Sequence, residues 1–432
     1  MKRAVSSLII SATAFCANAV NRFPKPDFSS GYEYPTHYYP VPAEPIWGII
    51  DLIVLVALMG VVAYAVIKRS IRRPVLWVTV ASVLYFGFFR EGCVCSVGSL
   101  QNIAAGVADS SIVVPIGVLL FFVLPILFTL FFGRVFCGGV CPLGAIQELV
   151  HIKSFRLSKA ISATLGLIPW FYLGFAVLFA ITRSGYLICR YDPFVGIFRL
   201  GGDTVIIGFG IVLLILSLFI GRPFCRFICP YGAVLSLFSR VSFKKTEITR
   251  HGCINCDLCR NACPVDAILP PYENQIKESR AKGVRRVLLY MIVLPLLMGV
   301  GAMLLRSVSD TLSLANKRVQ LLELVKTGQA DTQSIETVEL QAFFGKGGTV
   351  EDLQKEVEVV QSQFKMHSTW VGAFFGLVVG LTLLSLSLKR TRKTYTIDSA
   401  ACISCGRCFS YCPQNTLDPT GLVLNTELLK QK

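Results

Sequence analysis

Two runs of four cysteines in this chain have a spacing that suits iron–sulfur chemistry. Each run reads C-x2-C-x2-C-x3-C-P, in which three thiolates wrap one face of a [4Fe–4S] cubane and the fourth points to a second cluster. Structural zinc would instead show cysteine pairs separated by a longer spacer. The runs therefore predict two [4Fe–4S] clusters. The cysteines of the two runs are Cys253, Cys256, Cys259 and Cys263, then Cys402, Cys405, Cys408 and Cys412.

The fourth cysteine of each run is expected to complete the other run's cluster. Crossed ligation of this kind places Cys412 with the first three thiols of the first run, and Cys263 with the first three of the second. The two runs must then lie on the same side of the membrane and meet there. The sequence therefore predicts a two-cluster ferredoxin whose halves are separated by a long insertion.

A second cysteine motif occurs twice. The segment 133–145 reads G-R-x-F-C-x3-C-P-x-G-A and recurs 88 positions later as 221–233. A match at a fixed offset indicates a duplicated unit, and cysteines at i and i+4 share one helical face or one tight turn. The two copies could present four thiols to a third cluster or a redox-active site, or the thiols could pack as small apolar side chains. These cysteines are Cys137, Cys141, Cys225 and Cys229.

Three further cysteines are expected near the outer face. Cys93 and Cys95 open the loop after the second predicted span, and Cys189 opens the loop after the fourth. They could ligate a metal, exchange electrons with a periplasmic partner, or form a disulfide in an oxidising compartment. A bridge within C-x-C is strained, so a structural disulfide would join Cys189 to one of the pair.

The elements that position these cysteines are membrane spans. Hydrophobic residues make up 53% of the 432 residues and charged residues only 16%, which excludes an ordinary soluble domain. Seven apolar stretches are of roughly membrane length. They cover about 47–67, 75–89, 112–132, 161–181, 205–220, 287–305 and 370–388.

The net charge of +16 is explained by the membrane rather than by nucleic-acid binding. Lysine and arginine gather at alternate span ends, which are therefore cytoplasmic. Seven spans with the N-terminus outside satisfy every loop and place both ferredoxin runs in the cytoplasm. We expect a multi-pass protein of the bacterial cytoplasmic membrane.

The predicted fold is mainly α, a polytopic helix bundle with a split two-cluster ferredoxin domain. An eighth span is added if the N-terminal segment is retained as an anchor instead of being cleaved as a signal peptide. The external segment is expected to be a small helical cap or a surface for a partner. The expected parts are a signal or anchor (1–19), an external Pro/Tyr-rich strap (20–46), the transmembrane core (47–250), ferredoxin half 1 (251–284), a transmembrane helix (285–306), the external helical segment (307–369), a transmembrane helix (370–390) and ferredoxin half 2 (391–432).

The doubled G-R-x-F-C-x3-C-P-x-G-A motif followed by ferredoxin runs resembles the NosR/NapH-type membrane polyferredoxins. The resemblance covers about 75–264 plus the terminal run. It implies quinol-linked electron supply to a periplasmic redox enzyme, or a role in that enzyme's maturation. Two departures are the split runs and the lack of a recognisable flavinylation segment of the NosR kind.

We therefore expect a redox subunit of an oxidoreductase system, with no catalytic residues of its own. Its partners would be the quinone pool or membrane oxidoreductase subunits on one side, and a periplasmic flavin or haem protein on the other. A bound quinone is an additional expected cofactor. The alternatives are a copper reductase or assembly factor for a respiratory enzyme, and a membrane redox sensor. His151 and His251 lie near cysteine motifs and are expected to be interfacial residues rather than ligands.

Overall fold

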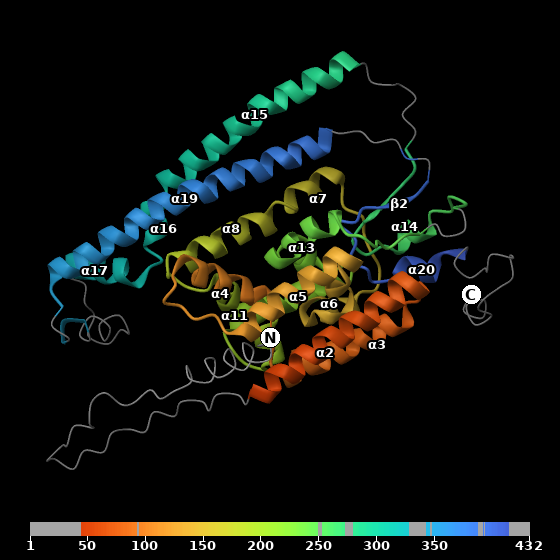
Figure 1. The fold of residues 1–432 in the computed structure, drawn as a ribbon, viewed down its shortest axis with the longest axis horizontal. Coiled ribbons are helices and arrows are strands. Elements are labelled where there is room, and N and C mark those ends of the chain that lie inside the picture. Colours follow the sequence, from red (N-terminus) through yellow and green to blue (C-terminus); the bar gives the residue numbers. More distant parts are fainter. Residues whose placement is uncertain are drawn as a thin grey trace, which may run out of the picture. The chain divides into compact units, whose positions relative to one another are not determined.

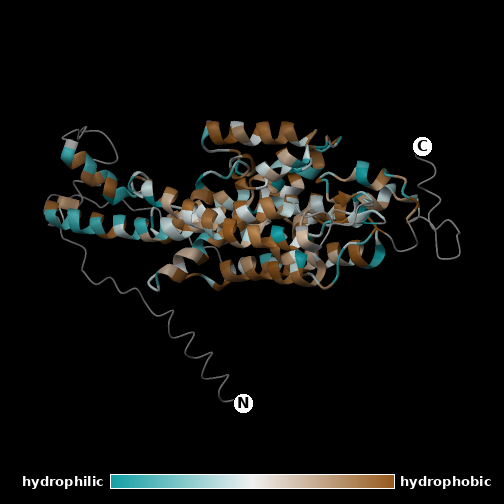
Figure 2. Cartoon of the chain, turned by 90° about the horizontal axis from the view of Figure 1, so that it is seen from above, coloured by the Kyte–Doolittle hydropathy of each residue, from teal (hydrophilic) through white to brown (hydrophobic). Residues whose placement is uncertain are grey.

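The computed structural model describes residues 45–92, 95–248, 253–272, 280–327, 343–345, 348–387, 392 and 394–413. The expected N-terminal signal or anchor, nearly all of the strap, Cys93 and His251 lie outside these residues. Within them the fold is mainly α-helical, as predicted (Figure 1). Hydrophobic residues dominate most of the helices (Figure 2).

The transmembrane core consists of helices that follow one another closely along the chain. Several are π-helical continuations of an α-helix, and these are designated η. The elements are α2 (Pro45–Ala63), η1 (Tyr64–Arg69), α3 (Arg73–Ser82), η2 (Val83–Phe89), α4 (Ser96–Ala108), α5 (Ile116–Phe132), η3 (Phe136–Val140), α6 (Pro142–Val150), α7 (Lys159–Leu165), α8 (Ile168–Ile181), α9 (Leu187–Arg190), α10 (Val195–Phe198), α11 (Thr204–Ser217), α12 (Pro223–Phe227) and α13 (Pro230–Arg240).

The predicted spans all fall on apolar helices. Four helices in the described part of the chain are long and apolar enough to cross a membrane: Ile46–Arg69, Lys159–Ile181, Gly283–Ser307 and Val350–Ser387. The other three predicted spans correspond to shorter apolar helices, namely Arg73–Phe89, Ile116–Phe132 and Thr204–Ser217. A membrane protein is thus confirmed, while the count of seven and the orientation stay predictions.

The insertion between the ferredoxin runs contains a helical hairpin. Its arms are α15 (Arg280–Ser307) and α19 (Val350–Ser387), which pack along each other (Figure 1). Glycines bring the two backbones together: a Cβ at Gly372 would lie 2.2 Å from the carbonyl oxygen of Gly301, and one at Gly376 would lie 2.1 Å from that of Leu297. Small residues at such spacing allow close helix packing where lipid supplies no hydrophobic driving force.

The described residues between the two arms are largely helical, and we refer to them as the cap. It contains α16 (Ser309–Ser313) and α17 (Lys317–Thr327), and both pack on α19. Leu321 and Leu322 from α17 are buried with Leu353 and Val357 from the first turns of α19. The cap and the second arm therefore share one continuous helix instead of being joined by a loop.

The two ferredoxin halves meet, as the crossed spacing requires. Strand β1 (Ile268–Leu269) pairs antiparallel with β2 (Thr396–Ile397), with Ile268 opposite Ile397. Helices α14 (Leu258–Ala262) and α20 (Arg407–Tyr411) pack against each other. Because β1 precedes the hairpin and β2 follows it, the ferredoxin halves lie at one end of the hairpin and the cap lies at the other (Figure 1).

Candidate metal centres

The two ferredoxin runs have the same irregular backbone. Asn255 and Asp257 in the first run have φ of 55° and 61°, and their counterparts Ser404 and Gly406 have 54° and 73°. These left-handed residues fold each C-x2-C-x2-C segment into a tight loop, which a short helix then follows. Non-glycine residues in this region carry strain, and Asn255 and Ser404 carry it at equivalent positions, as residues of functional loops often do.

The first set of thiols draws on both halves of the ferredoxin part. Burial, and then the neighbouring Cys412, Cys253 and Cys256, raise the pKa of the Cys259 thiol to about 11. Cys412 ends α20 in the second run, whereas the other three thiols belong to the first run. The four cysteines assigned to one cluster by crossed ligation therefore lie close together.

The second set is assembled in the same way. Burial, and then the thiol of Cys405 in the other run, raise the pKa of Cys263 to about 11. Burial, then Cys402, Cys405 and Cys263, raise the pKa of Cys408. Cys259 also acts on Cys408, so the two thiol sets are neighbours.

The donor chemistry of both sets fits a [4Fe–4S] cluster. Thiols that raise one another's pKa cannot stay ionised together unless a cationic centre holds them. Backbone amides already point at the sulfurs: Ala267 N–H donates to Cys263 Sγ (3.3 Å) and Ser404 N–H to Cys402 Sγ (3.5 Å). Such hydrogen bonds tune cluster potentials.

Among the described residues, no three Cys, His, Asp or Glu side chains are grouped as for one metal ion. A cubane distributes its ligands over four irons, so its thiols stand farther apart than the ligands of a single zinc.

The duplicated cysteine motif also comes together. Cys141 and Cys229 each directly precede a helix whose first residue is proline, α6 and α13 respectively, and proline suits that position because its missing N–H has no helical partner. Burial, and then Cys225, Cys137 and Cys229, raise the pKa of Cys141. The two copies therefore gather four thiols at one place, as the third-site interpretation expects.

The two copies make room for each other reciprocally. A Cβ at Gly144 of the first copy would lie 3.2 Å from Arg222 Nη1 of the second, and a Cβ at Gly232 would lie 3.2 Å from Arg134 Nη2 of the first. The glycine of each motif thus accommodates the arginine of the other. This exchange explains why both residue types recur in the motif.

Donors surround the sulfurs of this third set. Gln147 Nε2 lies 3.5 Å from Cys225 Sγ, Arg134 Nη2 lies 3.7 Å from Cys137 Sγ, and Gly232 N–H donates to Cys229 Sγ at 3.3 Å. Positive and N–H groups around buried sulfur favour the thiolate form that iron binds. The set therefore also fits an iron–sulfur cluster.

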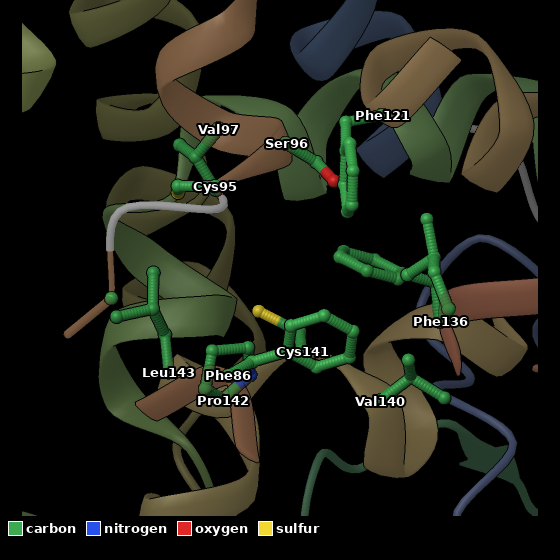
Figure 3. Close-up of a pocket in the computed structure, with 12 residues that line it drawn as sticks. Phe86, Cys95, Ser96, Val97, Phe121, Phe136, Val140, Cys141, Pro142 and Leu143 are labelled. Carbon is green, nitrogen blue, oxygen red and sulfur yellow. The ribbon is translucent and has the colours of Figure 1, made fainter. Parts of the chain in front are cut away.

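One of the cysteines expected at the outer face, Cys95, approaches the third set. Cys95 lies directly before α4, which packs against α5 and α8, so it is partly buried instead of lying in an exposed loop. It lines an apolar cavity that Cys141 also lines, with Phe86, Phe121 and Phe136 around it (Figure 3). The other cysteine, Cys189, sits against the first turn of α4, with its Sγ 3.0 Å from where a Gly98 Cβ would be.

The residues that the sequence interpretation missed are charged and lie far apart along the chain. Glu148 is 5% exposed and bonds to arginines from three separate segments. A single acidic residue between the many basic ones of that loop was the only signal in the sequence. Both ring nitrogens of His151 are paired with protein, to Ser217 O (2.8 Å) and Ser154 Oγ (2.9 Å), while its interfacial location stays a prediction.

Known families match all the cysteine motifs. A family described as a 4Fe-4S binding domain matches 114–159 and 203–248, the two copies of the duplicated unit. A second family with the same description matches 247–269 and 395–418, the two ferredoxin runs. Iron–sulfur binding is thereby supported for both kinds of motif. No solved structure matches the chain.

Several curated proteins are similar to this chain. The uncharacterized protein MJ0750 of Methanocaldococcus jannaschii is 28% identical over 191 residues, which are 42% of this chain and 77% of that protein. The regulatory protein NosR of Stutzerimonas stutzeri is 31% identical over 156 residues, 33% of this chain and 21% of NosR. The ferredoxin-type protein NapH of Escherichia coli is 28% identical over 179 residues, 40% of this chain and 60% of NapH. The similarity therefore spans only part of the named relatives.

Proposed function

Homology confirms the resemblance of this chain to the NosR/NapH-type membrane polyferredoxins, and from this premise we propose that it carries electrons through three [4Fe–4S] clusters. The donor is a quinol or a cytoplasmic-side reductant, and the acceptor is a periplasmic redox partner or its maturation system. Iron–sulfur clusters supply one-electron oxidation and reduction. The ligands are Cys253, Cys256, Cys259 and Cys412 for the first cluster, Cys263, Cys402, Cys405 and Cys408 for the second, and Cys137, Cys141, Cys225 and Cys229 for the third.

One contact carries the proposal: the second ferredoxin run rests directly on η3, the short helical segment between Cys137 and Cys141. A Cβ at Gly138 would lie 2.9 Å from the carbonyl oxygen of Ile403 and 3.0 Å from that of Ser404. This approach is closer than a side chain permits, so the ligand segments of the second and third sets are in backbone contact. Electron transfer between centres depends on such proximity.

The first run docks on the other copy of the duplicated unit. A Cβ at Gly221 would lie 2.2 Å from the carbonyl oxygen of Pro264, which follows the first run's fourth cysteine. Each copy thus receives one ferredoxin run at its own glycine. The duplicated unit acts as a platform that holds both clusters in a fixed position relative to the third.

The segment between two thiols of the third set packs on an apolar helix. Val75 O and Thr79 Oγ1 of α3 would be 3.2 and 2.9 Å from a Cβ at Gly139, and Ser82 Oγ donates to Val140 O. The segment η3 between Cys137 and Cys141 therefore lies beside α3, which is the first part of the apolar helix Arg73–Phe89. Positive charge at the ferredoxin-side ends of the spans supports a cytoplasmic location for the other two clusters.

Membrane vesicles of known orientation test this proposal. An impermeant reductant is added at the ferredoxin side, and an impermeant acceptor such as ferricyanide is trapped on the opposite side. The intact protein should reduce the trapped acceptor, and Cys225→Ser should abolish that reduction while the EPR signals of the two ferredoxin clusters remain. Equal acceptor reduction by Cys225→Ser would show that the third set is not on the route.

A matched control is Ser239→Ala, which removes a hydrogen bond from the same unit to Ser399 O (2.6 Å) without touching a thiol. It should leave acceptor reduction unchanged. Replacing the reductant by a quinol analogue, with and without the acceptor, then sets the direction of electron flow.

A further inference from the structure

A single buried carboxylate binds three arginines between the ferredoxin part and the duplicated unit. Glu148 lies in α6 and is 5% exposed. Arg72 Nη2 and Arg222 Nε each lie 3.1 Å from its oxygens, and Arg407 Nε lies at 2.8 Å. All three are charge-assisted hydrogen bonds in a site with little water, where such bonds are strong.

The three arginines come from three different parts of the fold. Arg72 directly precedes α3, Arg222 directly precedes α12 in the second copy of the duplicated unit, and Arg407 opens α20 in the second ferredoxin run. Arg222 is fully buried, and its other nitrogens donate to the carbonyls of Cys137 and Gly138. Glu148 therefore ties the second run to both copies of the unit.

This network has no counterpart on the other half of the pseudo-symmetric arrangement. The residue equivalent to Glu148 in the second copy is Ser236, and the residue equivalent to Arg407 in the first run is Leu258. The ion network thus serves one ferredoxin run only. That run is the one whose ligand loop rests on Gly138.

The network carries more positive than negative charge beside cluster ligands. Three guanidinium groups face one carboxylate, which leaves a surplus of two positive charges. Glu148, Arg222 and Arg72 are all close enough to act on the charge of Cys405. Nearby positive charge favours the more negative, reduced form of a cluster and so raises its reduction potential.

Apolar contacts could join the two parts at least as stably, because burying charges costs desolvation energy that the ion pairs do not fully recover. What apolar contacts could not provide is a local field and a fixed register. These two properties are what an electron-transfer contact needs.

We propose that Glu148 is a positioning residue for electron transfer, one that holds the second ferredoxin run on η3 and sets the potential of the centre that Cys405 ligates. The inference rests on the proposed function for the presence of that centre. It does not depend on whether the third set holds a cluster.

The test is an EPR redox titration of the anaerobically purified full-length protein. Glu148→Gln removes the negative charge and should raise the midpoint potential of the Cys405 centre, whereas Arg407→Gln removes a positive charge and should lower it. Each variant should change the equilibrium constant for electron exchange with the first cluster about tenfold. For one electron this corresponds to a change of about 59 mV in the midpoint potential of the Cys405 centre. Opposite signs are the signature of a field effect, because structural loosening alone would move both variants the same way.

Two further variants keep the test decisive. Arg260→Gln removes a first-run arginine whose ion pair with Asp257 is about one-third exposed, and it should leave the Cys405 centre unshifted. Arg407→Lys keeps the charge and should retain the potential, so the Arg407 pair carries the test if Glu148→Gln does not fold. Shifts of the same sign in the Glu148 and Arg407 variants, or none larger than in Arg260→Gln, would overturn the field effect.

Amide hydrogen exchange tests the positioning role of Glu148 independently of the redox potential. Amide protons of the second run, 402–409, should exchange faster in Glu148→Gln and in Arg407→Gln, while those of the first run, 253–263, should not. Unchanged exchange in 402–409 would overturn that role. If the three-cluster proposal fails because the third set holds no iron, the potential shifts and the exchange pattern are still expected, so the two failures are distinguishable.

Discussion

The ferredoxin runs and the duplicated C-x3-C-P unit use the same ligand type in different surroundings. In the runs, left-handed residues fold tight loops, and Cys256 remains exposed. In the duplicated unit, the thiols lie within short helices or directly before them, and Cys137, Cys141 and Cys229 are at most 8% exposed. Cysteine potentials and reactivity follow exposure and nearby charge. The loop-borne thiols are therefore suited to exchange with partners, and the helix-borne thiols to relay within the membrane part.

The two regions touch at glycines. Adding a methyl group at one of these glycines should lower the stability of the protein more than any other change considered below. Gly221→Ala puts a Cβ 2.2 Å from Pro264 O, and Gly138→Ala puts one 2.9 Å from Ile403 O. Overpacking against backbone costs about 1–3 kcal/mol. We expect both variants to melt at a lower temperature than the parent protein, with Gly221→Ala the lower of the two.

Gly208→Ala in α11 serves as the control, since nothing lies within 4 Å of its Cβ and alanine favours helix. It should be neutral or slightly stabilising. Equal melting temperatures for all three variants would mean that the runs do not rest on the duplicated unit.

The ion network around Glu148 should also make the free energy of unfolding depend on pH. Burial opposes ionisation of Glu148, but Arg222, Arg407 and Arg72 outweigh it and lower the pKa of the carboxyl below 4.5. A lowered folded-state pKa gives stabilisation that is present above the unfolded value and is lost as pH falls through the folded one. The parent protein should therefore lose more stability between pH 7 and pH 3 than Glu148→Gln does.

Thermal melts of the two proteins over that range supply the measurement. Acid release of iron affects both alike, so the difference between them isolates the carboxylate. Parallel curves would contradict an ionised Glu148 in the folded state.

The smallest loss of stability is expected where a partly buried ion pair holds the first run. Arg226 Nη1 pairs with Asp266 Oδ2 at 2.9 Å, with side chains 13% and 23% exposed. Partly solvated pairs of this kind contribute about 1 kcal/mol or less. Asp266→Asn should lower the melting temperature less than either glycine variant, and high salt should weaken the parent protein by a similar amount. If Asp266→Asn lowered the melting temperature as much as Gly221→Ala, the Arg226–Asp266 ion pair would contribute as much to docking of the first run as the Gly221–Pro264 contact, against this expectation.

Short-range spacing was enough to predict which cysteines lie near one another, while their role as cluster ligands stays a prediction. The i, i+3, i+6 and i+10 cysteines of each run predicted the crossed sets that the structure brings together, and the fixed offset predicted the meeting of Cys137 with Cys225. The helical nature of the spans followed from hydropathy in the same way. Cysteine spacing and hydropathy predict a feature correctly when residues close together in the sequence determine it.

Long-range contacts could not be predicted in this way. Glu148 meets Arg72, Arg222 and Arg407 across 76, 74 and 259 positions of sequence, and no local pattern links them. The partial burial of Cys95 was also missed, because hydropathy assigned it to a loop whereas α4 continues into the helical layer. The short helices at 73–89, 116–132 and 204–217 likewise show that apolar length alone does not fix a span count.

The most direct measurement of the three-cluster arrangement is the iron and labile-sulfide content of the anaerobically purified protein. The account predicts about twelve irons and about twelve sulfides per chain, and about eight of each after Cys137→Ser combined with Cys225→Ser. About eight of each in both proteins would contradict the third cluster, and zinc without labile sulfide would contradict all three.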